Sequence, residues 1–365
     1  MSNQILVGTA KGLIQYQIPR GTHWQAAQVH FQGFTVGLLY VDERSGRWWV
    51  GLSHKHWGEK LHYSDDGGAT WQESSVPTLQ GESLPNGQPA RLRQLWCMQH
   101  GGHDKPGTLW LGTDPGALFK SEDQGETFTL VRGLWDHPSR QQPGQWFGAG
   151  SDTPFIHSIV LDPRDSDHVY VAVSCAGVFE TRDGGWHWEP KNQGLVAAYL
   201  PNPEVEVGHD PHCLLMPRQH PGVLWQQNHC GIFYSGNGGA QWQEVSDAAG
   251  VPYYGFALAV DDANPRRAWV IPAERDAQRV AAGLALRVFQ TNDQGVTWES
   301  VSDGLPQQHA FDIVLRQAFA RQNKLMVFGT NNGNLYLSDT DSIHWKTISH
   351  TLPKVNSVII IQAPR

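Results

Sequence analysis

Two short groups of histidines have the residue types and spacing to bind a metal ion. They are His54-Lys55-His56 and His209-Asp210-Pro211-His212. Imidazole is the commonest protein ligand for zinc and related metals, and a catalytic zinc site keeps three protein ligands and one open position. We therefore expect one divalent ion, zinc or manganese, bound by at least three of six histidines. These six candidate ligands are His54, His56, His157, His209, His212 and His229.

Carboxylates and one lysine complete the candidate catalytic set. Asp210 and Glu274 are expected to lie in or next to the metal's ligand shell, and Asp114 is a further candidate acid or base. Lys11, within Thr9-Ala10-Lys11-Gly12, could contact an anionic group of a substrate. The alternatives stay open. The histidines could form a polar rim, each carboxylate alone is more typical of loop stabilisation, and Lys11 could be an exposed loop lysine.

These residues must be positioned by short strands, because the dominant pattern in the chain is a repeat. The pattern Ser/Thr-x-Asp-x-Gly-x-Thr-Trp is clearest from Ser64 to Trp71. Two copies are degenerate, one at Gly21 and Trp24 and one at Ser338 and Trp345. The closing aromatic residue of the seven copies stands at positions 24, 71, 128, 188, 242, 298 and 345. A repeat of this length predicts a propeller, here with seven blades and little helix.

The residue types of the repeat suit a tight turn. Glycine tolerates positive φ, the Asp carboxylate and Ser/Thr hydroxyl can accept the turn's backbone amides, and the Trp ring buries a large apolar surface. The pattern resembles the Asp-box, or bacterial neuraminidase, repeat of a propeller family. That family includes sialidases, other glycosidases, the sortilin ectodomain and a photosystem assembly factor, so the resemblance implies a fold and no single activity.

In such propellers the box connects the third and fourth strands of a blade, and this implies where the other turns lie. The turns between second and third strands and the starts of first strands would share one face, where propellers usually bind ligands. The six candidate histidines fall there, and antiparallel pairing around residue 220 brings His212 close to His229. The remaining histidines of interest are interpreted as solvated on the opposite face: His100, His103, His168 and His220.

The two ends of the chain are expected to share one blade within a single domain over residues 1–365. The segments 5–8 and 13–17 supply the second and third strands of the first blade, and Val355–Gln362 supplies its inner strand. Closing the ring in this way removes free sheet edges.

Two connections, 131–155 and 189–208, are unusually long. Long connections in compact domains are usually functional covers or disordered, and the Trp content argues against disorder. We interpret them as a partial lid, with Trp57 and Trp146 as walls on which a sugar could stack. The alternative is that they pad the surface or mediate oligomerisation.

Composition excludes several classes of partner. The net charge of −8 argues against nucleic acid or an anionic membrane surface as a partner, and no apolar run is long enough to span a bilayer. The first residues show no signal-peptide pattern, and four cysteines are too few for a disulfide framework. A cytoplasmic protein with reduced thiols and a small-molecule substrate is the expectation.

Three functions remain in competition. The first is a metal-dependent hydrolase or lyase that uses the histidine cluster. The second is a glycosidase of the sialidase type, although the only string similar to the sialidase Arg-Ile-Pro motif, Ile18-Pro19-Arg20, has the wrong order. The third is a non-catalytic binding or assembly propeller.

Overall fold

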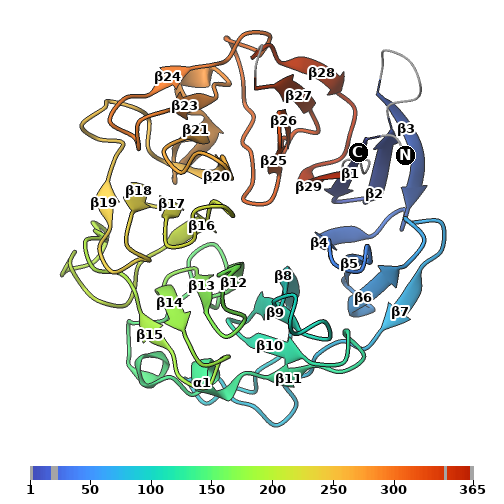
Figure 1. Ribbon diagram of the computed structural model, residues 1–365, viewed down its shortest axis with the longest axis vertical. Coiled ribbons are helices and arrows are strands. Elements are labelled where there is room, and N and C mark those ends of the chain that lie inside the picture. Colours follow the sequence, from blue (N-terminus) through green and yellow to red (C-terminus); the bar gives the residue numbers. More distant parts are fainter. Residues whose placement is uncertain (1–2, 18–23, 341–342, 362–365) are drawn as a thin grey trace. The chain divides into compact units, whose positions relative to one another are not determined.

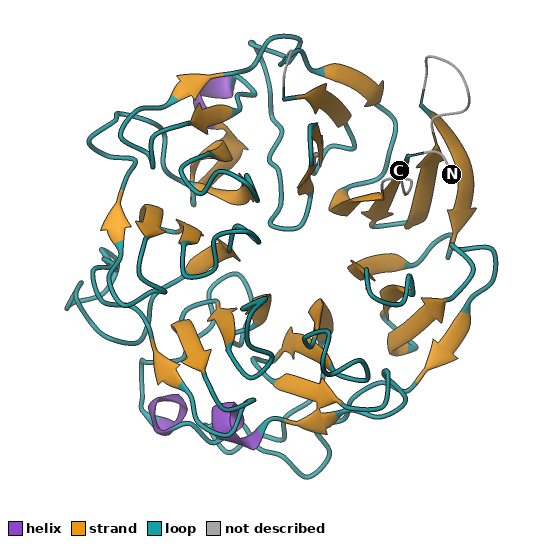
Figure 2. Cartoon of the chain, in the orientation of Figure 1, coloured by secondary structure: helices purple, strands orange, loops and turns teal. Residues whose placement is uncertain are grey.

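The computed structural model describes residues 3–17, 24–340 and 343–361, and almost all of its regular structure is β-strand. The described strands form seven antiparallel sheets, and the fold is a seven-bladed β-propeller, as predicted. Helix is confined to short segments between strands (Figure 2): α1 (Arg132–Trp135), η1 (Pro138–Gln141) and η2 (Ala282–Leu284). In the described part of the chain, no helix has the length and apolar character needed to cross a membrane.

The chain falls into two compact units, one of residues 38–224 with 235–243 and the other of 1–37, 225–234 and 244–365. The single domain over 1–365 stays a prediction. The fifth blade is a sheet of four strands. Its strands are β16 (Pro211–Leu215), β17 (Leu224–Asn228), β18 (Gly231–Ser235) and β19 (Gln243–Glu244).

Blades two to four follow one another along the chain, with consecutive strands paired in each. Blade two contains β4 (Thr35–Val41), β5 (Trp48–His54), β6 (Gly58–Ser64) and β7 (Gln72–Ser74). Blade three contains β8 (Gln94–His100), β9 (Leu109–Asp114), β10 (Leu118–Ser121) and β11 (Thr129–Leu130). Blade four contains β12 (Ile156–Leu161), β13 (Val169–Val173), β14 (Gly177–Thr181) and β15 (Glu189–Pro190).

The other three blades belong to the second unit. Blade one contains β29 (Val355–Ile361), β1 (Gln4–Thr9), β2 (Gly12–Gln17) and β3 (Gln25–His30). Blade six contains β20 (Gly255–Val260), β21 (Ala268–Arg275), β23 (Phe289–Thr291) and β24 (Glu299–Ser300), and β22 (Gln278–Ala281) also pairs with β21. Blade seven contains β25 (Phe319–Gln322), β26 (Leu325–Gly329), β27 (Leu335–Asp339) and β28 (Lys346–Ser349).

The second strands of the blades are covered on both faces. Every residue of β9 and of β13 is buried, and β13 is a continuous apolar run, as expected of a strand covered on both faces. The predicted starts of these second strands at Trp48, Leu109, Val169 and Ala268 are confirmed. Their tryptophans pack in the core: Trp49, Trp110, Trp225 and Trp269 are each at most 1% exposed.

The repeated turn has the hydrogen bonds that its residue types predict. In blade two, Ser64 Oγ accepts the Gly68 amide at 2.8 Å, and Gly68 adopts a φ of 88° that favours glycine. Asp66 accepts the Thr70 amide at 2.8 Å and the Thr70 hydroxyl at 2.6 Å. Equivalent bonds recur in the turns that begin at residues 121, 181, 235 and 291. Gly21, of the first degenerate copy, lies outside the described residues, as does the string 18–20.

The C-terminal strand completes the first blade, as predicted. β29 pairs antiparallel with β1, with Ile5 opposite Ile360, and β1 pairs in turn with β2. Figure 1 shows the red β29 next to the blue β1. β29 is also tied to the segment before β25, because the Val358 amide donates to the Gln317 carbonyl at 2.8 Å. Gln362, the last residue of the predicted strand, lies outside the described residues.

The connection 131–155 is a packed segment that contains α1 and η1. Trp146 is only 8% exposed, packs on Phe179 with ring centres 5.1 Å apart, and donates to the Ser139 hydroxyl at 2.9 Å. The interpretation of Trp146 as a sugar-stacking wall is therefore wrong, because its ring is part of the core. The connection 189–208 begins with β15 and meets the first connection where Phe147 contacts Tyr199, with ring centres 6.3 Å apart. The lid stays a prediction.

Candidate functional site: a carboxyl pair and a histidine cluster

Two carboxyl groups lie where blade two approaches blade three, near enough for the charge of Asp114 to act on Glu59. Glu59 is the second residue of β6, and Asp114 is the last residue of β9. Glu59 Oε2 accepts the backbone amide of Leu95 in β8 at 3.3 Å. Leu95 follows Gln94, and Gln94 is paired with Asp114 in the β8–β9 register. Glu59 therefore extends from blade two to the end of blade three where Asp114 lies.

Asp114 is buried and is held by the long connection 131–155. The Ser151 hydroxyl donates to Asp114 Oδ2 at 2.6 Å, and the Thr153 hydroxyl donates to Oδ1. Burial raises the pKa of Asp114 above the ordinary value for a carboxyl group. The connection is anchored to the same turn by Arg140, a buried arginine whose guanidinium stacks on Trp135 at 3.7 Å and donates to the Gly116 carbonyl. This connection thus fixes the geometry around Asp114.

Glu59 is half-buried and its pKa is also raised, first by burial and then by the charge of Asp114. The Ser53 hydroxyl, directly opposite in the β5–β6 register, donates to Glu59 Oε1 at 2.5 Å. A raised pKa favours the protonated form of a carboxyl group, and a pair in which one group is protonated while the other is ionised can act as acid and base together. This is the protonation state that acid–base catalysis by two carboxyl groups requires.

Sequence reasoning identified Asp114 and missed Glu59. The position of Glu59 in the sequence could have indicated it. Glu59 directly follows the segment His54-Lys55-His56-Trp57-Gly58, which the repeat pattern assigns to the ligand-binding face. The structure places His54 at the end of β5 and His56 in the turn that follows, with ring centres 5.7 Å apart. Trp57, in the same turn, is 70% exposed. These two histidines therefore lie in the segment that leads from β5 to Glu59 in β6.

An arginine lies at the same end of blade three. The Arg93 amide donates to the Asp114 carbonyl at 2.7 Å, and its guanidinium pairs with Asp152 at 3.0 Å. The charge of Arg93 acts on the Asp114 carboxyl in the direction of a lower pKa, but burial outweighs it. The half-exposed guanidinium of Arg93 is thus near enough to Asp114 for its charge to act on that carboxyl group.

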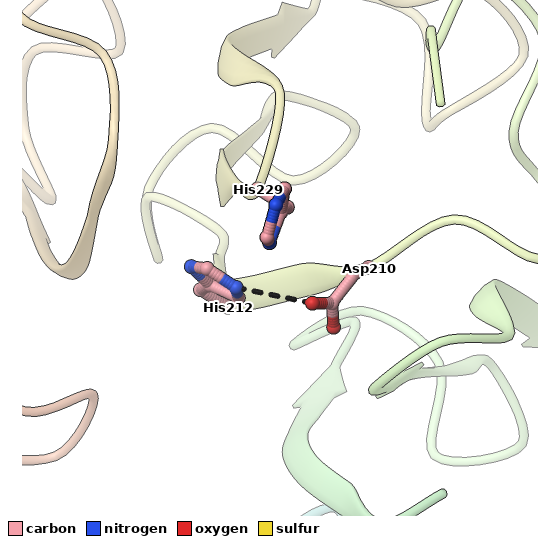
Figure 3. Close-up of side chains that lie close together, drawn as sticks. All are labelled: Asp210, His212 and His229. Carbon is pink, nitrogen blue, oxygen red and sulfur yellow. Dashed lines mark hydrogen bonds and ion pairs between the residues drawn. The ribbon is translucent and has the colours of Figure 1, made fainter. Parts of the chain in front are cut away.

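A second group of side chains lies on blade five. Asp210, His212 and His229 offer ligand atoms that all lie within 4.8 Å of one another, and within the described residues no other set of three or more His, Cys, Asp or Glu side chains does so. Asp210 precedes β16, His212 lies on β16, and His229 follows β17. Figure 3 shows the three side chains facing one another, with the Asp210–His212 hydrogen bond of 3.2 Å between Oδ2 and Nε2. The predicted approach of His212 to His229 is confirmed.

The other predicted site residues lie outside this group. His157 is buried, with Nδ1 2.9 Å from the Ser158 hydroxyl. His209 is fully buried, its Nε2 lies 2.6 Å from the Val205 carbonyl, and burial lowers its pKa. Glu274 is exposed and accepts the Gly283 amide at 2.7 Å, and Lys11 is exposed in the turn after β1.

His168 lies in a turn, as predicted, but it is not solvated. Its side chain is buried between two buried carboxylates, with Nδ1 3.0 Å from Asp162 and Nε2 2.6 Å from Glu180. Burial alone would raise the pKa of Glu180, but hydrogen bonds from His168 and Lys191 hold it at about 2. The four cysteines, all among the described residues, form no disulfide.

No protein-family model matches the sequence. Over 282 residues the chain is 25% identical to the oligoxyloglucan-reducing end-specific xyloglucanase of Emericella nidulans, and the match covers 66% of this chain and 30% of that enzyme. Among solved structures, the periplasmic gluconolactonase of Pseudomonas aeruginosa matches all of both chains with a TM-score of 0.62 and 14% identity. An ancestral GH74 enzyme matches 86% of this chain and 36% of its own with a TM-score of 0.52 and 14% identity.

These comparisons define a class. The chain is a seven-bladed propeller with distant homologues among the xyloglucanases, and the solved structures support the fold alone. The chain spans about a third of the length of the curated relatives that it matches. Their activity is therefore a matter for proposal.

Proposed function

We propose that the chain is a glycoside hydrolase whose acid–base groups are Glu59 and Asp114. The observation that carries the proposal is that two carboxyl groups with raised pKa values lie at one end of blades two and three, where Glu59 accepts the Leu95 amide and the charge of Asp114 acts on Glu59. Hydrolysis of a glycosidic bond commonly uses one protonated carboxyl group, which protonates the leaving oxygen, and one carboxylate, which acts as base or nucleophile. The similarity to xyloglucanases supports the same activity.

The surroundings of the two groups suggest their roles. Glu59 is half-buried and its pKa is raised both by burial and by the Asp114 charge, so it is assigned as the proton donor. Asp114 accepts hydroxyl hydrogen bonds on both carboxylate oxygens, and such bonds stabilise the ionised form. Asp114 is therefore assigned as the carboxylate that acts as base or nucleophile.

The substrate class proposed is a neutral oligosaccharide of the xyloglucan type. The exposed ring of Trp57, two residues before Glu59 in the chain, gives a flat apolar surface on which the face of a sugar ring can stack. The predicted sialidase-type substrate is less well supported, because the curated relatives are xyloglucanases. A metal ion has no part in this mechanism, and the histidine cluster is considered separately below.

The test is hydrolysis of xyloglucan oligosaccharides by the purified chain, with the products identified by mass spectrometry. Glu59→Gln and Asp114→Asn should each lower kcat by about 100- to 10,000-fold, the range typical for general acid–base groups. The matched control is Glu73→Gln in the same blade, an exposed carboxylate that pairs with Lys60 at 2.5 Å and should leave kcat unchanged. Equal activity of all three variants, or no hydrolysis by the parent chain, would overturn the proposal.

A further inference from the structure

We propose that Asp210, His212 and His229 bind one divalent transition-metal ion, zinc or manganese. This site is on blade five and does not depend on the proposed glycosidase activity. Its ligand atoms lie within 4.8 Å of one another, so a single ion among them could contact all three after small side-chain movements. Two imidazoles and one carboxylate suit zinc and manganese, and three protein ligands leave positions for water or a substrate oxygen.

The carboxylate of Asp210 is already oriented for this role. Its Oδ1 accepts the Ser174 hydroxyl at 2.8 Å and the Cys175 amide at 3.2 Å. Its Oδ2 is directed toward His212 Nε2 at 3.2 Å. One oxygen is therefore fixed by blade four and the other faces the imidazoles, as is usual for a metal-binding carboxylate held by a second set of hydrogen bonds.

The two histidines are also held in place. His212 is 2% exposed and lies on β16, where its backbone is fixed by the sheet. The ring of His229 packs edge-on against Tyr254, with ring centres 5.4 Å apart, and the Tyr254 hydroxyl donates to Asp276 at 3.0 Å. Because the rotamers are restricted before an ion arrives, little side-chain entropy remains to be lost on binding.

Burial distinguishes this group from an ordinary histidine–carboxylate contact. His187 and Asp183 in the repeated turn of blade four also form a close pair, at 2.6 Å, but the His187 side chain is 90% exposed and no third ligand atom completes a set. The pair on blade five is buried, and His229 adds the third donor. His187 therefore provides a matched control with the same two residue types.

The experiment uses the full chain purified without a polyhistidine tag and treated with EDTA. Calorimetric titration with zinc and with manganese should show one ion bound per chain. Loss of a ligand in His212→Ala, His229→Ala or Asp210→Asn should weaken binding by roughly 100-fold or more, whereas His187→Ala should bind as the parent does. The cobalt form of the parent should show visible absorption bands that the ligand variants lack.

Should His212→Ala fail to fold, the half-buried His229 provides the deciding variant. No stoichiometric binding by the parent, or unchanged binding by both His229→Ala and Asp210→Asn, would overturn the proposal.

Discussion

The position of Glu59 raises the pKa of its carboxyl group and thereby affects the stability of the fold as well as the proposed catalysis. Its raised pKa means that the folded protein binds a proton at this site more tightly than the unfolded chain does. That contribution to stability is fully present below the ordinary carboxyl pKa of about 4.3 and is lost as the pH rises through the raised value. Above the raised pKa, an ionised Glu59 therefore lowers the free energy of unfolding.

We accordingly predict that Glu59→Gln is more stable than the parent at pH 7.5, by about 0.5–2 kcal/mol, and little different below about pH 4. Urea denaturation at the two pH values measures this. Glu73→Gln should behave oppositely, because the hydrogen bond from Lys60 lowers the pKa of Glu73. A Glu59→Gln protein that is less stable at both pH values would contradict the assignment of Glu59 to an unfavourable site.

At the residue scale, local sequence patterns predicted one histidine contact and missed the burial of another histidine. The pairing of His212 with His229 was predictable, because both lie close to a hairpin whose turn residues are visible in the sequence. His168 was assigned to solvent because it lies in a turn. Its ring nitrogens instead contact Asp162 in the same turn and Glu180 in β14, the strand paired with β13. Such contacts depend on cross-strand register, which no local pattern in the sequence specifies.

At the scale of single elements, the repeated turn lowers the pKa of its carboxyl group, whereas the surroundings of Glu59 raise the pKa of that residue. Hydrogen bonds from the Thr70 hydroxyl and amide lower the pKa of Asp66 to about 2. The stability that this carboxylate contributes is present above the unfolded pKa of about 3.9 and is lost as the pH falls through about 2. The role of the turn is therefore structural at neutral pH.

We predict that Asp66→Ala lowers the melting temperature at pH 7 and that the difference from the parent decreases as the pH approaches 2. Hydrolysis below the melting temperature should be retained. Glu122→Ala, which removes an exposed carboxylate next to another copy of the turn, should have no such pH-dependent effect, because exposed ion pairs contribute little. Circular dichroism at pH 7 and pH 2.5 measures both variants. Loss of hydrolysis with an unchanged melting temperature would instead assign the Asp66 turn to the chemistry.

The long connection 131–155 marks the limit of prediction for elements. Its length and Trp content were visible, and they correctly argued for an ordered segment. Its contacts could not be predicted. Arg140, Ser151 and Thr153 donate hydrogen bonds to the end of β9 and the turn after it, which lie far from them in the sequence. Without a periodic pattern, nothing in the sequence distinguished a buried Trp146 from an exposed one.

For the whole molecule, the number of blades was predictable because the closing aromatic residue of the turn survives in every copy, including the degenerate ones. The sharing of blade one between the two ends was predictable from the order of strands and repeated turns. Only two strands precede the first copy of the turn, and β29 follows the last copy. Which blades carry the functional groups could not be predicted, because these groups lie at strand ends whose residues do not recur from one repeat to the next.

The role of β29 leads to a prediction for the whole chain. β29 covers β1 along Gln4–Thr9, and its Val358 and Ile360 are buried in the same core cluster as Ile5 and Val7. Deleting residues 355–365 would expose the edge of β1 together with this apolar surface, and an exposed edge pairs readily with other chains. We expect insoluble protein, or soluble protein without a cooperative thermal transition.

The matched control is deletion of residues 362–365 alone, which leaves every β29–β1 pair in place and should melt as the parent does. Solubility after expression and the width of the calorimetric transition distinguish the two deletions, because loss of one inner strand removes an entire row of backbone hydrogen bonds as well as the side chains packed beneath it. A soluble protein that lacks residues 355–365 and still unfolds cooperatively would show that the first blade is stable with three strands, and that β29 is not needed to complete the propeller.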